Sequence, residues 1–491
     1  MRDDEIADLP LWRLSEMVRS REITSTRLTR IYLERITTYD EGLPINSYIT
    51  VAREAALAQA AEADAVIESG KPLGPLHGLP FALKDNIETE GIRTTGGSKI
   101  LSSHIPVRDA FVVKKLKRAG AVILGKTNMP EFALGATTNN PHYGPTRNPY
   151  DLIRTPGGSS GGSAAATAAG LAAASLGTDT GGSVRVPSGL CGVVGLRPTH
   201  GRVGRGGIIP LSFSRDCVGP ITRTVRDSAM VLEVIAGRDG RDPQSASRPV
   251  PPYSDLTPDG LKGRRFGLPK RFIADMIHQD TEEIVDDAVR IIRAMGGVIR
   301  EIDIPSLSLA HAADFNVVMP EAVCLLGEYL LALDPSASIE ACLDLMGTGA
   351  REILGHEAGG PGSRPVPGYL YLSTLRNECK MMKAGFRKAM HGLDALLLPT
   401  TPAPAPRIDE DPEMELNGSM KSVFLTNIRN CLPLSIVGYP AISVPAGYSK
   451  AGLPIGLQIV ARPWEEARLF SMAYGFEQAT KCRRAPRLVR P

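Results

Sequence analysis

The sequence has little cysteine and no arrangement of cysteine that could hold a fold together. Its 491 residues include seven cysteines, an odd number, scattered along the chain without a CxxC pair. Disulfide frameworks and zinc sites both require paired or closely spaced ligands, and the eight histidines show no metal-ligand spacing either. We therefore expect buried free thiols in a reducing compartment, no metal and no other cofactor.

The sequence also lacks an excess of charge and a long hydrophobic run. Its 56 Lys and Arg residues against 53 Asp and Glu leave a net charge of +3, too balanced for a nucleic-acid scavenger or a polybasic membrane binder. The longest segment poor in polar residues, 164–176, is too short to span a bilayer, and the acidic N-terminus lacks the apolar stretch of a signal peptide. We expect a cytoplasmic protein that binds neither nucleic acid nor membranes.

What the sequence does contain is an alternation of short apolar segments with helical patterns. Residues 9–70 carry apolar side chains at helical spacing, and strand and helix candidates alternate from residue 72 onward. Such alternation predicts a single α/β domain over 1–491, with a central mixed β-sheet covered by helices on both faces. Within it we expect three parts: N-terminal helices over 1–70, a core over 71–240, and a variable, substrate-facing insertion over 305–365 that Gly-Gly-Pro-Gly (359–362) interrupts.

Residues 120–127 match the phosphate-binding pattern GxxxxGK[ST], but their chemistry opposes that function. The four intervening residues are Ala-Val-Ile-Leu, which predict a strand rather than a loop whose N–H groups surround an anion. Pro130 also follows too closely for an uninterrupted helix to begin at Lys126. We expect no nucleotide site here.

Residues 158–162 match GxSxG, the nucleophile elbow of α/β-hydrolases. The elbow must follow a buried strand, yet the residues before it, 148–156, contain two prolines. Ser159 or Ser160 could instead cap an Ala-rich helix that follows. A Ser-His-Asp hydrolase is therefore disfavoured.

A larger constellation surrounds these serines. Thr-Pro-Gly-Gly-Ser-Ser-Gly-Gly-Ser (155–163) is followed by Leu-Gly-Thr-Asp-Thr-Gly-Gly-Ser-Val-Arg-Val-Pro (176–187) and Cys-Gly-Val-Val-Gly-Leu-Arg-Pro-Thr (191–199). Together with Gly-Leu-Pro-Phe-Ala-Leu-Lys-Asp-Asn (78–86), Pro-Ala-Ile-Ser-Val-Pro (440–445) and Gly-Leu-Pro-Ile-Gly-Leu-Gln (452–458), this pattern resembles the amidase signature family. The resemblance covers about residues 10–480. It implies one amidase domain that cleaves a carboxamide C–N bond through an acyl-enzyme.

The resemblance implies a role for each motif residue. It places the nucleophile on Ser183, the bridging serine on Ser159 and the base on Lys84, with a cis peptide between Gly158 and Ser159. A serine hydroxyl needs a neighbouring base, and only a neutral lysine can serve, so the pKa of Lys84 must fall from its ordinary ~10.4 through burial. The resemblance assigns the oxyanion to the backbone N–H groups of Thr180, Gly181, Gly182 and Ser183.

Other residues near these motifs have supporting roles in the prediction. Asp179 and Arg185 flank the nucleophile, and we expect them to form a pair that orients its loop. Asp216 and Arg215 are expected to be structural. Met129 and Phe132 are candidates for the acyl pocket, although a core role fits them equally well.

The substrate depends on the acyl pocket, where family members differ. The glutaminase component of the tRNA-dependent amidotransferase, its A subunit, needs an Arg and an Asp for the two charges of glutamine. In this sequence those positions fall near Cys379, one turn from Arg376, and near Asn427 or Ile428. The segment 208–220 is more similar to indoleacetamide and mandelamide hydrolases, which predicts a small neutral amide with an apolar or aromatic acyl part.

Two alternatives to that substrate remain open. One is an aryl-acylamidase or carbamate hydrolase, in which the amine side is aromatic. The other is the glutaminase A subunit of the amidotransferase, which acts with partner subunits. For the main interpretation no macromolecular partner is needed, and a homodimer is compatible with it.

Overall fold

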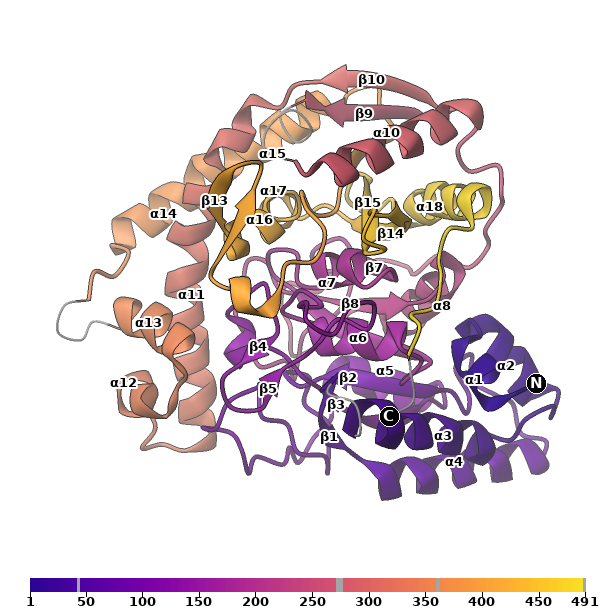
Figure 1. Ribbon diagram of the computed structural model, residues 1–491. Helices are drawn as coiled ribbons and strands as arrows, with labels where there is room; N and C mark the ends of the chain where they lie inside the picture. Colours follow the sequence, from indigo (N-terminus) through magenta and orange to yellow (C-terminus); the bar gives the residue numbers. More distant parts are fainter. Residues whose placement is uncertain (42–44, 271–276, 359–362, 489–491) are drawn as a thin grey trace.

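The computed structural model describes residues 1–41, 45–270, 277–358 and 363–488, so the Gly-Gly-Pro-Gly segment at 359–362 lies outside the described residues. The centre is an 11-stranded mixed sheet, which runs from β1 at the bottom to β10 at the top of Figure 1. In spatial order its strands are β1 (Tyr48–Val51), β3 (Val122–Thr127), β2 (Pro80–Lys84), β6 (Ala174–Asp179), β8 (Cys217–Thr222), β7 (Val194–Arg197), β14 (Ala441–Tyr448), β15 (Pro454–Val460), β11 (Ala395–Pro399), β9 (Arg265–Pro269) and β10 (Val298–Ile302).

The sheet is parallel in two places, and one of them creates the site. Strand β2 runs parallel to β3 and to β6, with Leu83 opposite Leu176. The carboxyl ends of parallel neighbours lie at the same sheet edge, so Lys84 at the end of β2 and Asp179 at the end of β6 are brought together. The other parallel group is β11–β9–β10, and the remaining pairs are antiparallel.

Helices flank the sheet along its length: α4 packs on β3, α6 on β6, α7 on β14 and β15, and α8 on β8. The helices of this layer are α1 (Asp3–Asp8), α2 (Leu11–Arg19), α3 (Ser25–Arg35), α4 (Arg53–Glu68), α5 (Phe111–Arg118), α6 (Gly161–Ala168), α7 (Arg185–Leu190), α8 (Val225–Ile235), α10 (Gln279–Ala294) and α18 (Glu466–Thr480). The fold is therefore the single α/β domain that the sequence predicts.

A second group of helices lies on one side of the sheet, at the left of Figure 1. It consists of α11 (Ala310–Leu333), α12 (Ile339–Cys342), α13 (Thr348–Glu357), α14 (Gly368–Arg376) and α15 (Glu378–Ala389). Two short helices, α16 (Val423–Ile428) and α17 (Leu432–Val437), lie beside it, after the hairpin of β12 (Glu413–Leu416) and β13 (Ser419–Ser422). A second small pair is β4 (Asn139–Asn140) and β5 (Gly144–Pro145), and single turns are η1 (Ile36–Glu41), η2 (Glu131–Ala133), η3 (Pro305–Leu309), η4 (Leu343–Leu345) and η5 (Ile408–Glu410).

Several local predictions differ from the structure. Residues 9–70 are not all helical, because Tyr48–Val51 forms edge strand β1. The Ala-rich helix after Ser160 stops at Ala168, and the chain then enters strand β6, whose Ala, Ser and Gly residues have low strand propensity. Strands β7 and β8 are also absent from the prediction. For β6 pairing within a buried sheet outweighs local propensity, whereas the Tyr-Ile-Thr-Val residues of β1 favour a strand by themselves.

The structure shows what the GxxxxGK[ST] and GxSxG segments form. Val122–Thr127 is buried strand β3, and Lys126 lies inside the protein, where its Nζ donates to the carbonyl of Ile87 and to Thr94 Oγ1. The GxSxG segment begins in a turn rather than after a strand, and Ser160 Oγ donates to the carbonyl of Thr178 at 3.2 Å. Residues 120–127 are therefore structural, and Ser160 is not placed on a nucleophile elbow, as the sequence predicts.

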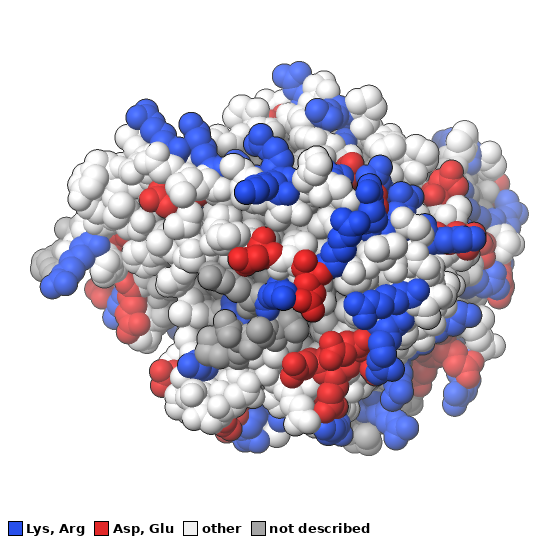
Figure 2. Space-filling model, turned by 90° about the horizontal axis from the view of Figure 1, so that it is seen from above, with Lys and Arg blue, Asp and Glu red and all other residues white. Residues whose placement is uncertain are grey.

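The surface agrees only in part with the sequence-based expectations. Lys and Arg side chains lie beside Asp and Glu side chains over much of the face in Figure 2, as the balanced charge predicts. Five cysteines are buried, but Cys324 is exposed and Cys482 is half-buried.

Among the described residues one helix, Pro305–Leu333, is long and apolar enough to cross a membrane by length and composition alone. It packs against α13, α14 and α17.

Candidate active site

Lys84 is completely buried at the end of β2. Its Nζ donates to Ser159 Oγ at 2.7 Å and to Thr178 Oγ1 at 2.8 Å. Burial lowers the pKa of Lys84 from 10.5 to about 7, although the carboxylates of Asp216 and Asp179 act in the opposite direction. A large share of this lysine is therefore neutral near neutral pH and able to accept a proton.

Ser159 reaches Lys84 from the loop before α6. The peptide between Gly158 and Ser159 is cis, as the resemblance implies. The next residue, Ser160, donates its backbone N–H to the carbonyl of Ser183 at 3.1 Å. The loop that carries Ser159 is thereby joined directly to the loop that carries Ser183.

The loop with Ser183 follows β6 and is held by the carboxylate of Asp179. Asp179 Oδ1 and Oδ2 accept from the backbone N–H groups of Gly182 at 3.0 Å and Val184 at 3.2 Å. Burial alone would raise the pKa of Asp179, but the guanidinium groups of Arg185 and Arg197 outweigh it and hold that pKa well below its usual range. The carboxylate thus stays ionised and fixes the loop by accepting these two backbone hydrogen bonds.

One of the predicted oxyanion donors already has a partner within the loop. The N–H of Gly182 already donates to Asp179, so this group is engaged in shaping the loop. The structure leaves the backbone of Thr180, Gly181 and Ser183 as the candidates, and Gly181 and Ser183 are only half-buried in an otherwise buried stretch. Gly182 has a φ of +133°, and a Cβ there would lie 2.6 Å from Cβ of Cys431, so only glycine fits.

Arg185 connects the loop to the C-terminal part of the chain. It pairs with both oxygens of Asp179 at 3.0 Å, which confirms the predicted contact between the two residues. Its remaining N–H groups donate to Gln458 Oε1 at 2.7 Å on β15, to Ser435 Oγ at 2.9 Å on α17, and to the carbonyl of Cys431 at 3.0 Å. No local pattern in the sequence indicates these partners, because they lie far along the chain from Arg185.

A second chain of contacts links the loop to helix α11. Thr180 Oγ1 donates to Asp216 Oδ1 at 2.6 Å, and Asp216 Oδ2 accepts from the backbone N–H of Ser212 at 2.9 Å. Ser212 Oγ in turn donates to Glu321 of α11, which also accepts from Tyr371 of α14 at 3.1 Å. Asp216 therefore has the structural role predicted for it, and Glu321 is a buried anchor that sequence reasoning missed.

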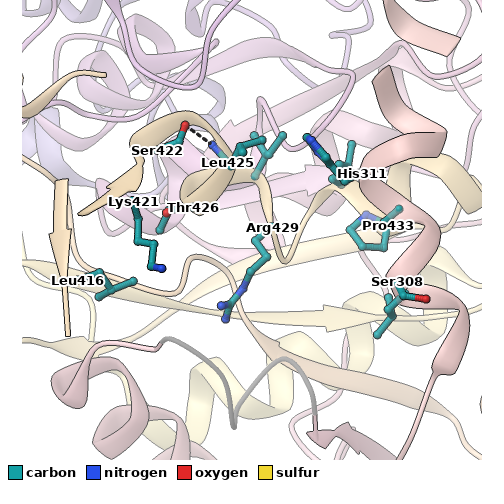
Figure 3. A pocket seen from close by; sticks show the side chains of 13 residues that line it. Ser308, His311, Leu416, Lys421, Ser422, Leu425, Thr426, Arg429 and Pro433 are labelled. Carbon is teal, nitrogen blue, oxygen red and sulfur yellow. Dashed lines mark hydrogen bonds between the residues drawn. The ribbon is translucent and has the colours of Figure 1, made fainter. Parts of the chain in front are cut away.

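A cavity of about 470 Å³ has Leu432, a neighbour of the loop that carries Ser183, in its wall. It is lined by the turn before α11, the first residues of α11, the β12–β13 hairpin and the α16–α17 segment, as Figure 3 shows. Leu432 belongs to its wall, and a Cβ at Gly181 would lie 3.5 Å from Cδ1 of Leu432. Leu432 therefore connects the cavity wall to the loop that carries Ser183, and Lys84, Ser159 and Ser183 are not among the lining residues.

The predicted pocket residues Met129 and Phe132 do not line this cavity. Met129 is fully buried, and Phe132 packs with Ile209 and residues of α11 in a hydrophobic cluster. The core role is thus the one the structure supports. Of the positions compared with the glutaminase of the amidotransferase, Ile428 lines the cavity, Cys379 is buried in a neighbouring cluster, and Arg376 is exposed on α14.

No group of three or more His, Cys, Asp or Glu side chains in the described part of the chain is arranged to hold a metal ion.

The central role of Asp179 predicts a large loss of stability on its replacement. Asp179→Asn leaves the buried guanidinium groups of Arg185 and Arg197 without their anion, and we expect the free energy of unfolding to fall by about 3–5 kcal/mol. Urea unfolding measures it. The matched control is Asp287→Asn, which removes the exposed pair with Arg290 and should cost no more than ~1 kcal/mol; equal stability of the two variants would contradict the role of Asp179.

Comparison with known proteins identifies the family. The family model described as Amidase matches residues 27–470. The glutamyl-tRNA(Gln) amidotransferase A subunit of Geobacter sp. (strain M21) is 40% identical over 488 residues, which cover 97% of this chain and 98% of that protein. The solved structure of native peptide amidase from Stenotrophomonas maltophilia is 34% identical with a TM-score of 0.86, and covers 97% of this chain and 98% of its own.

A further solved structure, the glutamyl-tRNA(Gln) amidotransferase A subunit of Thermotoga maritima, has a TM-score of 0.79 at 31% identity, over 99% of this chain and 98% of its own. These relatives do not support the predicted special likeness to indoleacetamide and mandelamide hydrolases. They do agree with the resemblance to the amidase signature family that the sequence motifs indicate. The protein therefore belongs to the amidase family and is a hydrolase of amide C–N bonds.

Proposed function

We propose that the protein hydrolyses a small amide through a Ser183–Ser159–Lys84 triad and an acyl-enzyme. The observation that carries the proposal is the buried Lys84, bonded to Ser159 at 2.7 Å beside the loop of Ser183. Neutral Lys84 takes a proton from Ser159 while Ser159 takes the proton of Ser183, whose Oγ attacks the amide carbon. Lys84 then returns the proton to the leaving amine through Ser159, and water hydrolyses the ester on Ser183.

The backbone donors in this proposal are the N–H groups of Thr180, Gly181 and Ser183. They stabilise the oxyanion that forms on the amide oxygen, a contribution of about 3 kcal/mol for each donor. Asp179 and Arg185 position the loop that presents them. The hydrogen bond from Thr180 to Asp216 also holds this loop.

For the substrate we propose an amide with an apolar or aromatic acyl part. The cavity beside Gly181 has Leu307, Leu425 and Ile428 in its wall. Ile428 is one of the positions compared with the Asp that the amidotransferase glutaminase uses for the ammonium of glutamine. An uncompensated ammonium in such surroundings would lose several kcal/mol, whereas apolar groups gain ~25 cal/mol for each Å² buried.

The second candidate is the glutaminase of an amidotransferase, which releases ammonia from glutamine in a complex. Its support is the 40% identity to the Geobacter amidotransferase protein over nearly the full length of both chains. It predicts that the protein co-purifies with partner subunits and uses glutamine only with them. An aryl-acylamidase or carbamate hydrolase, whose substrate is aromatic on the amine side, would use the same triad.

The buried base predicts a pH profile. Protonated Lys84 cannot accept a proton, so kcat/KM should fall on the acid side with a midpoint near the pKa of about 7 and be constant above it. Because the Asp216 carboxylate raises the pKa of Lys84, Asp216→Asn should move this midpoint to lower pH. Lys84→Ala should lose activity at every pH, and near-native activity of that variant at pH 8 would exclude Lys84 as the base.

A panel of amides tests the substrate class with the isolated chain. Phenylacetamide and indoleacetamide should have kcat/KM values at least about tenfold above glutamine, which corresponds to ~1.4 kcal/mol. Ammonia release, or aniline release for anilides, is the measurement, and Ser183→Ala provides the background. Equal or better hydrolysis of free glutamine would contradict the apolar substrate and would indicate that Arg376 binds the carboxylate of glutamine.

A further inference from the structure

The charged side chains of the cavity beside Gly181 all carry one sign. Lys421 of β13 and Arg429, just after α16, line it together with His311 of α11. No Asp or Glu occurs among its lining residues in the described part of the chain. Figure 3 shows Lys421 and Arg429 extending to the same side of the cavity, with His311 on the helix across from them.

Lys421 is suited to bind a ligand group. It is half-buried, and no ion pair or hydrogen bond of its ammonium group is formed with the residues that the structure describes. The hydroxyl of its neighbour Ser422 already has a partner within α16, because Ser422 Oγ accepts a hydrogen bond from the N–H of Leu425 at 3.3 Å. Arg429 is held in place in part by a bond from its Nε to Asn430 Oδ1 at 3.2 Å. The lysine is thus the side chain on which the inference rests.

Much of the remaining wall is apolar. Leu416, Leu425, Ile428 and Leu432 line the cavity, and Leu432 is the residue next to Gly181. A substrate whose acyl part occupies this cavity therefore meets both hydrocarbon and a positive charge. A carboxylate that leaves water is stabilised by such a charge, whereas an ammonium group meets charge of its own sign.

We propose that the substrate carries a single anion, a carboxylate at the end remote from the amide, which Lys421 binds. The substrate class is then the monoamide of an apolar dicarboxylic acid. The inference rests on the proposed function and refines it: glutamine is rejected for its ammonium group and not for its carboxylate. Glutaramate, which is glutamine without that ammonium, is accordingly a better substrate than glutamine.

Two matched series of amides test the inference. One series has a terminal carboxylate, from glutaramate at five carbons to the ten-carbon monoamide, and the other has a terminal methyl at the same lengths. At the best chain length the intact protein should prefer the carboxylate by about tenfold in kcat/KM, the size expected for one hydrogen bond to a charged group. Glutamine should be at least about tenfold below glutaramate by the same measure.

Variants of Lys421 identify the cause of the preference. Lys421→Met should bring the carboxylate-to-methyl ratio to about one, Lys421→Arg should keep it, and Lys421→Glu should favour amides with a terminal amine. Lys380→Met, on the exposed surface of α15, is the control and should leave the ratio unchanged. A ratio that does not respond to Lys421→Met would overturn the inference, as would an intact protein that favours the methyl series.

The two proposals fail in different ways. Hydrolysis of both series that requires Ser183 but shows no preference controlled by Lys421 overturns the inference and leaves the proposed function intact. Absence of turnover on both series, with glutamine used only in the presence of partner subunits, overturns both.

Discussion

The burial of one lysine at the end of a parallel strand is the constraint on which the site depends. Lys84 is placed by β2, and its parallel neighbour β6 supplies Thr178 as a second acceptor for the same ammonium nitrogen. The apolar strand that precedes Lys84 removes water from it and lowers its pKa to about 7. A solvated lysine at the same distance from Ser159 would stay protonated and could not act as a base.

A second buried charge, the carboxylate of Asp179, fixes the shape of the loop that carries Ser183. Asp179 accepts from Gly182 and Val184 and is held by Arg185 and Arg197. Since Arg185 also donates to α17 and β15, the loop is fixed by residues from both halves of the chain. This arrangement explains physically why the site belongs to one large domain: the core around residues 71–240 does not by itself supply every contact that Arg185 makes.

The sequence predicts the residues proposed for catalysis through their motifs, whereas much of the surrounding fold depends on contacts between distant segments. Ser159 and Ser183 lie in glycine- and serine-rich motifs and Lys84 in an apolar one, and all three are identified through the resemblance to the amidase signature family. Strand β6 escaped prediction because Ala, Ser and Gly favour a strand only when neighbours on both sides pair with them. The partners of Arg185, the anchor Glu321 and the cavity next to Gly181 depend on contacts between distant segments, which local patterns do not encode.

The most direct measurement of the central claim is the position of a covalent adduct formed by a fluorophosphonate, which reacts with an activated serine. Two serines compete in the sequence, Ser183 after β6 and Ser160 in the GxSxG segment, and Ser160 Oγ is engaged with the carbonyl of Thr178. Peptide mapping of the labelled protein should place the adduct on Ser183, and Lys84→Ala should suppress the labelling. An adduct on Ser160, or labelling that persists unchanged without Lys84, would contradict the account.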